Sequence, residues 1–100
     1  MSVNHIGEEE FTKEVLEAKE PVFVDFYADW CGPCRMLSPI MEEISETHKV
    51  YKINTDEAMN LAREYGIMSI PCVILFKDGK EVNRSIGLRT KKDILKMVDE

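Results

Sequence analysis

Two cysteines separated by two residues, Cys31 and Cys34, are the part of this sequence best suited to chemistry. Such a pair indicates a redox-active dithiol, half of a zinc site or a structural disulfide. The pair follows an apolar, strand-like run (residues 21–28) and precedes a helical pattern of apolar residues (37–44). A Cys-x-x-Cys between a strand and a helix is typical of a redox motif. We therefore interpret the pair as a reversible dithiol.

The two cysteines are expected to have different roles. A cysteine in the first turn of a helix faces unpaired N–H groups and the positive end of the helix dipole, which favour the thiolate. Cys31 lies at that end, so we assign it as the attacking nucleophile. Cys34, one turn further on, is assigned as the thiol that resolves a mixed disulfide. Gly32 and Pro33 keep the connection tight, and proline suits the first helical turn.

The two alternatives, a structural disulfide and a zinc site, have less support. In the loop-entropy model, closing a loop of about four residues removes only ~2 kcal/mol of unfolded-state entropy, against ~4.7 kcal/mol for a loop of ~100 residues. A disulfide between Cys31 and Cys34 would therefore stabilise the fold only weakly, and it suits a bond that opens and closes. A structural zinc site needs a closed set of protein ligands. Beyond the pair the sequence offers only Cys72 and two histidines, with no second Cys-x-x-Cys. We therefore predict no metal site.

An acidic residue, Asp25, interrupts the apolar run before the cysteine pair. A carboxylate in a buried strand is unfavourable unless it is paired or protonated, and burial raises its pKa. We predict that Asp25 lies beneath the pair and takes the proton from Cys34, directly or through a water, when that thiol attacks. Lys52, in the next predicted strand, is its expected charge partner. The alternative for both residues is a charged end that lies in solvent.

Composition limits the classes of function. At 100 residues the chain is expected to form one domain, residues 1–100. Its net charge of −6 argues against nucleic-acid binding, which needs a basic surface. Acidic residues 8–10 stand where a signal peptide would be apolar, and no apolar run is long enough to span a membrane. We therefore expect a cytoplasmic protein, in which a disulfide is catalytic rather than structural.

The periodicity of apolar residues predicts alternating strands and helices. Strands are expected over residues 3–6, 22–28, 50–54, 72–77 and 80–86, and helices over 8–19, from the cysteine pair to about 47, 56–65 and from 90 onward. Asp78 and Gly79 predict a tight hairpin. Gly66 predicts the end of the third helix, and Pro39 a kink in the second. This order predicts an α/β fold with a central mixed sheet.

Taken together, these motifs resemble the thioredoxin family. The strand with Asp25, the Trp30–Cys34 motif, residues 52–56, Ile70–Pro71, residues 76–79 and Gly87 occur in the family's order across almost the whole chain. The resemblance implies a thioredoxin fold, in which a central five-stranded mixed sheet is flanked by four helices. It also implies a protein disulfide reductase that works by thiol–disulfide exchange.

The resemblance also implies partners and site residues. No cofactor would be bound, because a thioredoxin reductase would recharge the pair with electrons from NADPH through FAD. Substrates would be disulfide-containing proteins, and we expect a monomer. Asp25 and Lys52 match the family's buried acid and its neighbour, and Pro71 matches a cis-proline that faces the active site. The apolar surface that grips an extended substrate would include Trp30, Ile70 and Gly87. The alternatives are a core anchor for Trp30 and a strand-end turn for Gly87.

Three features depart from the usual family pattern. Tyr27 stands where many members have tryptophan, residues 46–50 form a shorter connection, and Cys72 stands where threonine is usual. Cys72 is either a small buried side chain or a third redox participant beside the pair. Two other functions also stay open on this fold: a redox-independent binding subunit, and a disulfide oxidase or isomerase.

Overall fold

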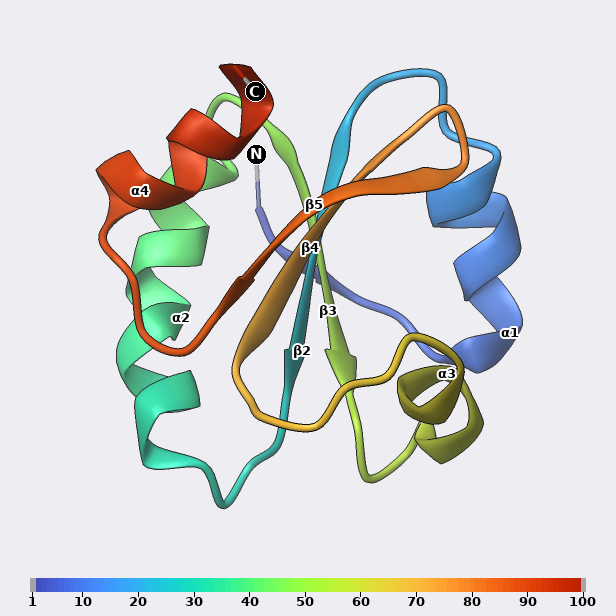
Figure 1. Cartoon of the computed structure of the whole chain (residues 1–100), viewed down its shortest axis with the longest axis horizontal. Helices are drawn as coiled ribbons and strands as arrows, with labels where there is room; N and C mark the ends of the chain where they lie inside the picture. Colours follow the sequence, from blue (N-terminus) through green and yellow to red (C-terminus); the bar gives the residue numbers. More distant parts are fainter. Residues whose placement is uncertain (1, 100) are drawn as a thin grey trace.

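A central five-stranded sheet organises the fold in the computed structural model, which describes residues 2–99 (Figure 1). The strand order is β1-β3-β2-β4-β5. β1, β3 and β2 run parallel, whereas β4 is antiparallel to β2 and to β5. The predicted mixed sheet is confirmed. The strands are β1 (Asn4–His5), β2 (Val22–Tyr27), β3 (Lys49–Asn54), β4 (Cys72–Lys77) and β5 (Lys80–Ile86).

Helices cover both faces of this sheet. α2 and α4 lie on one side of it and α1 and α3 on the other (Figure 1). α1 continues as a π-helical segment, η1, and α4 continues as a 3-10 segment, η2. The helical segments are α1 (Glu8–Phe11), η1 (Thr12–Leu16), α2 (Gly32–Ile44), α3 (Met59–Glu64), α4 (Lys91–Leu95) and η2 (Lys96–Asp99).

Side-chain alternation along β2 separates the core into two layers. Val24 and Phe26 belong to the cluster under α1 and α3, whereas Phe23 packs with Leu37 of α2. Because successive side chains of a strand point to opposite faces, Asp25 faces α2 together with Phe23. The whole of residues 22–26 is buried, as expected for a central strand that is covered on both faces.

Helix ends differ most from the predictions. α3 begins at Met59 rather than at residue 56, because residues 55–57 form a turn. The first helix ends at Leu16, where Glu17 N–H donates to the Thr12 carbonyl at 2.9 Å, a π-type bond that finishes the helix early. Pro39 lies inside α2, which is helical without interruption from Gly32 to Ile44, so the kink stays a prediction.

The hairpin between β4 and β5 turns at Asp78 and Gly79, whose φ angles are 53° and 79°. A Cβ atom on Gly79 would lie 2.8 Å from the carbonyl oxygen of Leu16. Gly66 is a matched control, because its φ is also positive, at 63°, but a Cβ there would meet nothing within 4 Å. We expect Gly66→Ala to lower the unfolding free energy by about 1–2 kcal/mol through backbone strain. Gly79→Ala should lower it by about 1–3 kcal/mol more because of the added overlap.

Guanidinium titration of both variants, followed by far-UV circular dichroism, measures these two losses. Equal losses at the two glycines would contradict the close approach between the hairpin and the end of η1.

Candidate active site

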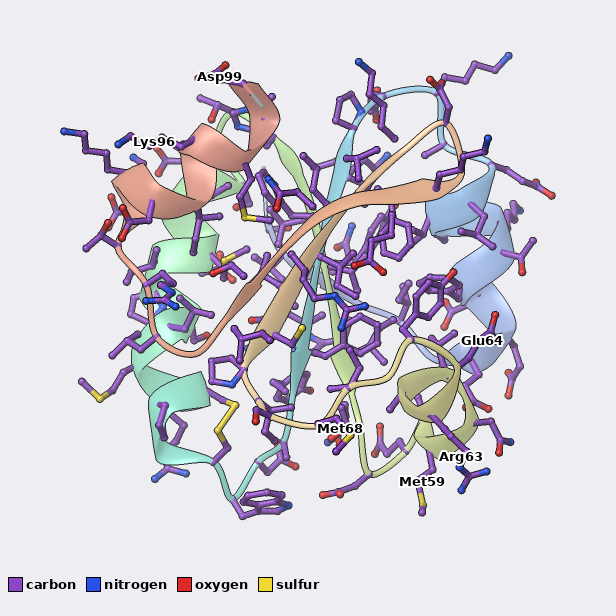
Figure 2. The ribbon with its side chains drawn as sticks, in the orientation of Figure 1. Met59, Arg63, Glu64, Met68, Lys96 and Asp99 are labelled. Atoms are coloured by element: carbon purple, nitrogen blue, oxygen red, sulfur yellow. A yellow bond between two sulfur atoms is a disulfide. The ribbon has the colours of Figure 1, made fainter. Side chains whose placement is uncertain are left out.

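Cys31 and Cys34 lie where β2 leads into α2 and are joined by a disulfide, with their Cα atoms 5.2 Å apart. The sulfur–sulfur bond is visible at the first turn of α2 (Figure 2). Cys31 is the N-cap residue of α2, and Pro33 lies in the first helical positions. Proline is well tolerated there, because the N–H that it lacks would have no partner within the helix.

The sulfur of Cys31 lies in a polar environment formed by the backbone. It accepts a hydrogen bond from the Cys34 N–H at 3.2 Å and lies 3.8 Å from the carbonyl oxygen of Ile70. Both cysteines are nearly buried, at 5% and 2% exposure for Cys31 and Cys34. A sulfur that accepts an N–H at a helix N-terminus is stabilised as the thiolate. This geometry supports the assignment of Cys31 as the nucleophile.

Asp25 is fully buried, with 0% exposure, so the alternative of a solvated carboxylate does not hold. Neither of its carboxyl oxygens has a hydrogen-bond partner among the described residues. Burial raises the pKa of Asp25 to about 7, and the positive charge of Lys52 acts in the opposite direction. A carboxyl with such a pKa can take up and release a proton near neutral pH.

Lys52 lies opposite Asp25 in the register between β3 and β2 and is 9% exposed. The ion pairs found among residues 2–99 do not include Asp25. Instead, Lys52 Nζ donates to the hydroxyl of Ser38 at 3.2 Å and lies 4.4 Å from the ring centroid of Tyr27. Lys52 therefore acts on Asp25 through charge at a distance rather than through contact.

A cavity of about 380 Å³ opens beside Cys34 and Lys52. It is also lined by His5, Tyr27, Ala28, Asp29, Arg35 and Ser38. This cavity gives water a route to the inner end of the disulfide.

The predicted substrate-binding residues gather on the other side of Cys31. Ile70 packs against the cysteines, and the Ile70–Pro71 peptide bond is cis, as the resemblance implied. Gly87 N–H donates to the Pro71 carbonyl at 2.8 Å. Trp30 is 70% exposed, so it is not a core anchor. Its indole N–H donates to Asp56 Oδ2 at 2.9 Å.

Comparison with known proteins agrees with this geometry. A family model described as Thioredoxin matches residues 2–100. The chain belongs to the thioredoxin family. Thioredoxin of Rickettsia felis is 48% identical over an alignment of 101 positions, which covers 97% of this chain and 96% of that protein. Thioredoxin 1 of Synechococcus elongatus is 46% identical over 94 residues, which cover 90% of this chain and 88% of that protein.

The fold comparison gives the same family. The structure of a mutant thioredoxin from Halobacterium salinarum aligns with a TM-score of 0.90 at 34% identity, covering 98% of this chain and 88% of that chain. Family membership and the Cys31–Cys34 disulfide together identify this thioredoxin-family protein as a thiol–disulfide oxidoreductase.

Two polar contacts of this thioredoxin site were missed by sequence reasoning. Ser38 lies one helical turn after Cys34, and that spacing could have placed it on the same face of α2. Asp56 belongs to a segment that resembles the family, but nothing in its spacing connects it to Trp30. Both contacts join elements that are distant in sequence.

Cys72, the residue that departs from the family pattern, begins β4 and is unpaired and 1% exposed. Its side chain belongs to the cluster under α1 and α3, on the face of the sheet opposite α2. Burial raises the pKa of the Cys72 thiol, and the charge of Arg84 opposes this rise. This environment favours a small buried side chain over a third redox participant.

We expect iodoacetamide to modify Cys72 in the reduced native protein at least about tenfold more slowly than Cys31, because both burial and a raised pKa deplete the reactive thiolate. Mass spectrometry of timed samples measures the rate at each cysteine, and denatured protein, in which both should react alike, is the control. Comparable native rates would favour a redox role for Cys72.

Among the described residues, no group of three or more histidine, cysteine, aspartate or glutamate side chains could hold a metal ion. Nor does that part of the chain contain a helix long and apolar enough to cross a membrane.

Proposed function

We propose that this protein reduces disulfides in target proteins, with Cys31 as the nucleophile and Cys34 as the resolving thiol. The observation that best supports this proposal is the position of Cys31 Sγ, which caps α2 and accepts a hydrogen bond from the Cys34 N–H. The Cys31 thiolate attacks one substrate sulfur, so that a mixed disulfide forms and one substrate thiolate leaves. Cys34 then attacks Cys31 Sγ, which releases the second substrate thiolate and forms the Cys31–Cys34 disulfide. Two electrons pass from the pair to the substrate.

Asp25 is the proposed proton acceptor for the second step. Cys34 must lose its proton before it attacks, and Asp25 is buried on the face of the sheet that carries α2. The cavity beside Cys34 has room for a water. Lys52, which lies opposite Asp25 in the sheet register, also lines this cavity, and we propose that the proton passes to Asp25 from this side. Lys52 is proposed to adjust the charge of this acceptor from a distance.

Trp30, Ile70, Pro71 and Gly87 are proposed to grip an extended substrate segment, while Gly32 and Pro33 keep the connection between the two cysteines tight. Two exposed methionines, labelled in Figure 2, are Met59 at 62% and Met68 at 93% exposure. Both line a surface hollow together with Asp56, which accepts the hydrogen bond from the Trp30 indole. Such an exposed apolar surface is typical of a site that binds other proteins.

The remaining assignments follow from the family. We propose that a thioredoxin reductase recharges the disulfide, using NADPH and FAD, so that this chain holds no cofactor of its own. We also propose a monomeric protein of one domain, residues 1–100, in the cytoplasm, where a reductase of this kind keeps thiols reduced.

Replacing Asp25 by asparagine tests the proton-transfer step. We expect Asp25→Asn to slow reduction of insulin disulfides at least about tenfold at pH 7, because an amide cannot accept the Cys34 proton. The rate of the unmodified protein should rise as the pH passes through about 7, where Asp25 becomes ionised, and the variant should lose this rise.

Stopped-flow fluorescence of Trp30, the single tryptophan of the chain, follows the reaction across pH. Asp78→Asn is the matched control, since Asp78 is an exposed hairpin residue in a conformation that asparagine adopts readily. An unchanged rate and pH profile in Asp25→Asn would remove Asp25 from the mechanism and leave the roles of the two cysteines intact.

A further inference from the structure

The ammonium of Lys52 is held by two groups, neither of which is Asp25. Lys52 extends from β3, Tyr27 ends β2 and Ser38 lies on α2. The Ser38 hydroxyl accepts a hydrogen bond from Lys52 Nζ at 3.2 Å, and the face of the Tyr27 ring lies 4.4 Å from the same nitrogen. Two different elements therefore hold the end of a lysine that belongs to a third.

A flexible lysine needs such contacts to remain in this place. At 9% exposure, Lys52 has given up most of its contact with water, although long lysine side chains usually extend to keep their charge hydrated. The cavity beside Cys34 offers a path outward. Without the ring and the hydroxyl, the ammonium would be free to move through this cavity into solvent.

We propose that Tyr27 and Ser38 are positioning residues, which hold the Lys52 ammonium within electrostatic range of Asp25 but out of contact with its carboxyl. They thereby set the pH at which Asp25 takes up a proton. This inference rests on the proposed role of Asp25 as the proton acceptor for Cys34.

The distance between the Lys52 ammonium and the Asp25 carboxyl matters, because either extreme would move the pKa of Asp25 away from neutral pH. A contact ion pair would keep Asp25 ionised and make it a weak base, because an opposite charge at close range strongly favours the carboxylate. With no cation nearby, burial alone would favour the protonated form. A cation held at an intermediate distance leaves Asp25 able to exchange a proton near neutral pH.

Other titratable and charged groups lie around the carboxyl and the cavity, and none of them is replaced in the variants that test this proposal. On β4, Val73 faces Asp25 across the sheet and carries no charge, whereas the thiol of the neighbouring Cys72 interacts electrostatically with Asp25. The cavity brings in titratable or charged groups from β1, from the segment after β2 and from α2. These groups are His5, Asp29, Cys34 and Arg35. Tyr27→Leu also removes the ring that packs edge-on against His5, with ring centroids 5.8 Å apart. The Lys52→Met background therefore has to separate that effect from the displacement of Lys52.

The test is a direct titration of the Asp25 carboxyl by carbon NMR in the oxidised protein, in which Cys34 carries no thiol proton. We expect Ser38→Ala and Tyr27→Leu each to raise the pKa of Asp25, with at least about a threefold increase in proton affinity, because the opposing charge moves away. Tyr27→Phe, which keeps the ring face, is the matched control and should leave the titration unchanged.

A Lys52→Met background decides whether the two residues act through the lysine. Lys52→Met should itself raise the pKa of Asp25, and adding Ser38→Ala or Tyr27→Leu should then cause no further change. A shift that persists in this background, a downward shift, or no shift with lysine present would each overturn the proposal. This titration involves no turnover, so its failure is distinct from a failure of Asp25 as proton acceptor, which the rate of Asp25→Asn measures.

Discussion

A protein in which Cys34 is replaced by serine is expected to complete one attack and then remain covalently bound to its substrate. Cys31 still caps α2 and accepts a backbone N–H at its sulfur, so formation of the mixed disulfide is preserved. A serine hydroxyl cannot resolve that disulfide, because at neutral pH it provides almost no nucleophilic anion. Turnover should fall to the uncatalysed level, and about one substrate molecule should be trapped per chain.

Non-reducing electrophoresis and intact-mass measurement of Cys34→Ser after incubation with an oxidised substrate protein detect the adduct. Cys31→Ser is the matched control, since it removes the nucleophile and should trap nothing. Because Cys72 is buried on the opposite face of the sheet, the double variant Cys34→Ser/Cys72→Ser should trap as well as the single variant. Continued turnover of Cys34→Ser without added thiol would show that another group resolves the intermediate.

The sequence predicted those features of this site that depend on local pattern. A strand buried on both faces, a cysteine pair at a helix start and the Asp78–Gly79 hairpin each have a signature within a few residues, and the structure confirms them. The burial of Asp25 could be inferred in the same way, because its neighbours in β2 are apolar throughout.

Contacts between distant elements could not be inferred locally. The position of the Lys52 ammonium depends on the sheet register and on the packing of α2 against it, which together bring Ser38 and Tyr27 to one nitrogen. The hydrogen bond from Trp30 to Asp56 likewise joins two loops. The cis bond before Pro71 was implied only by the family resemblance, since about one X–Pro bond in twenty is cis in folded proteins.

The buried carboxyl that we assign to catalysis is also expected to destabilise the protein at alkaline pH. Asp25 ionises with a pKa of about 7 in the folded state, against a reference value of 3.8. Below both values the folded and unfolded states hold the proton equally, and between them only the folded state holds it. The unfolding free energy therefore falls as the pH rises from about 4 to about 7, by a total on the order of 4 kcal/mol.

Asp25→Ala should consequently be more stable than the unmodified protein at pH 8, by about 2–4 kcal/mol once the small cavity left by the substitution is allowed for. Near pH 4 the gain should vanish or reverse, because the carboxyl is then neutral in the folded protein. Asp25→Asn should gain less at pH 8, since a buried amide without hydrogen-bond partners costs about 1–3 kcal/mol.

Guanidinium unfolding of the oxidised protein and of both variants, at pH 4, 6 and 8, measures this dependence. A difference between Asp25→Ala and the unmodified protein that stayed constant across pH would mean that ionisation of Asp25 is not its cause. The expected pattern would show that a buried carboxyl without a hydrogen-bond partner in β2 destabilises the folded protein once it ionises. The proposed role of Asp25 as proton acceptor for Cys34 requires this ionisation. A contact ion pair with Lys52 would stabilise that carboxylate and, by lowering its pKa, weaken it as the acceptor of the Cys34 proton.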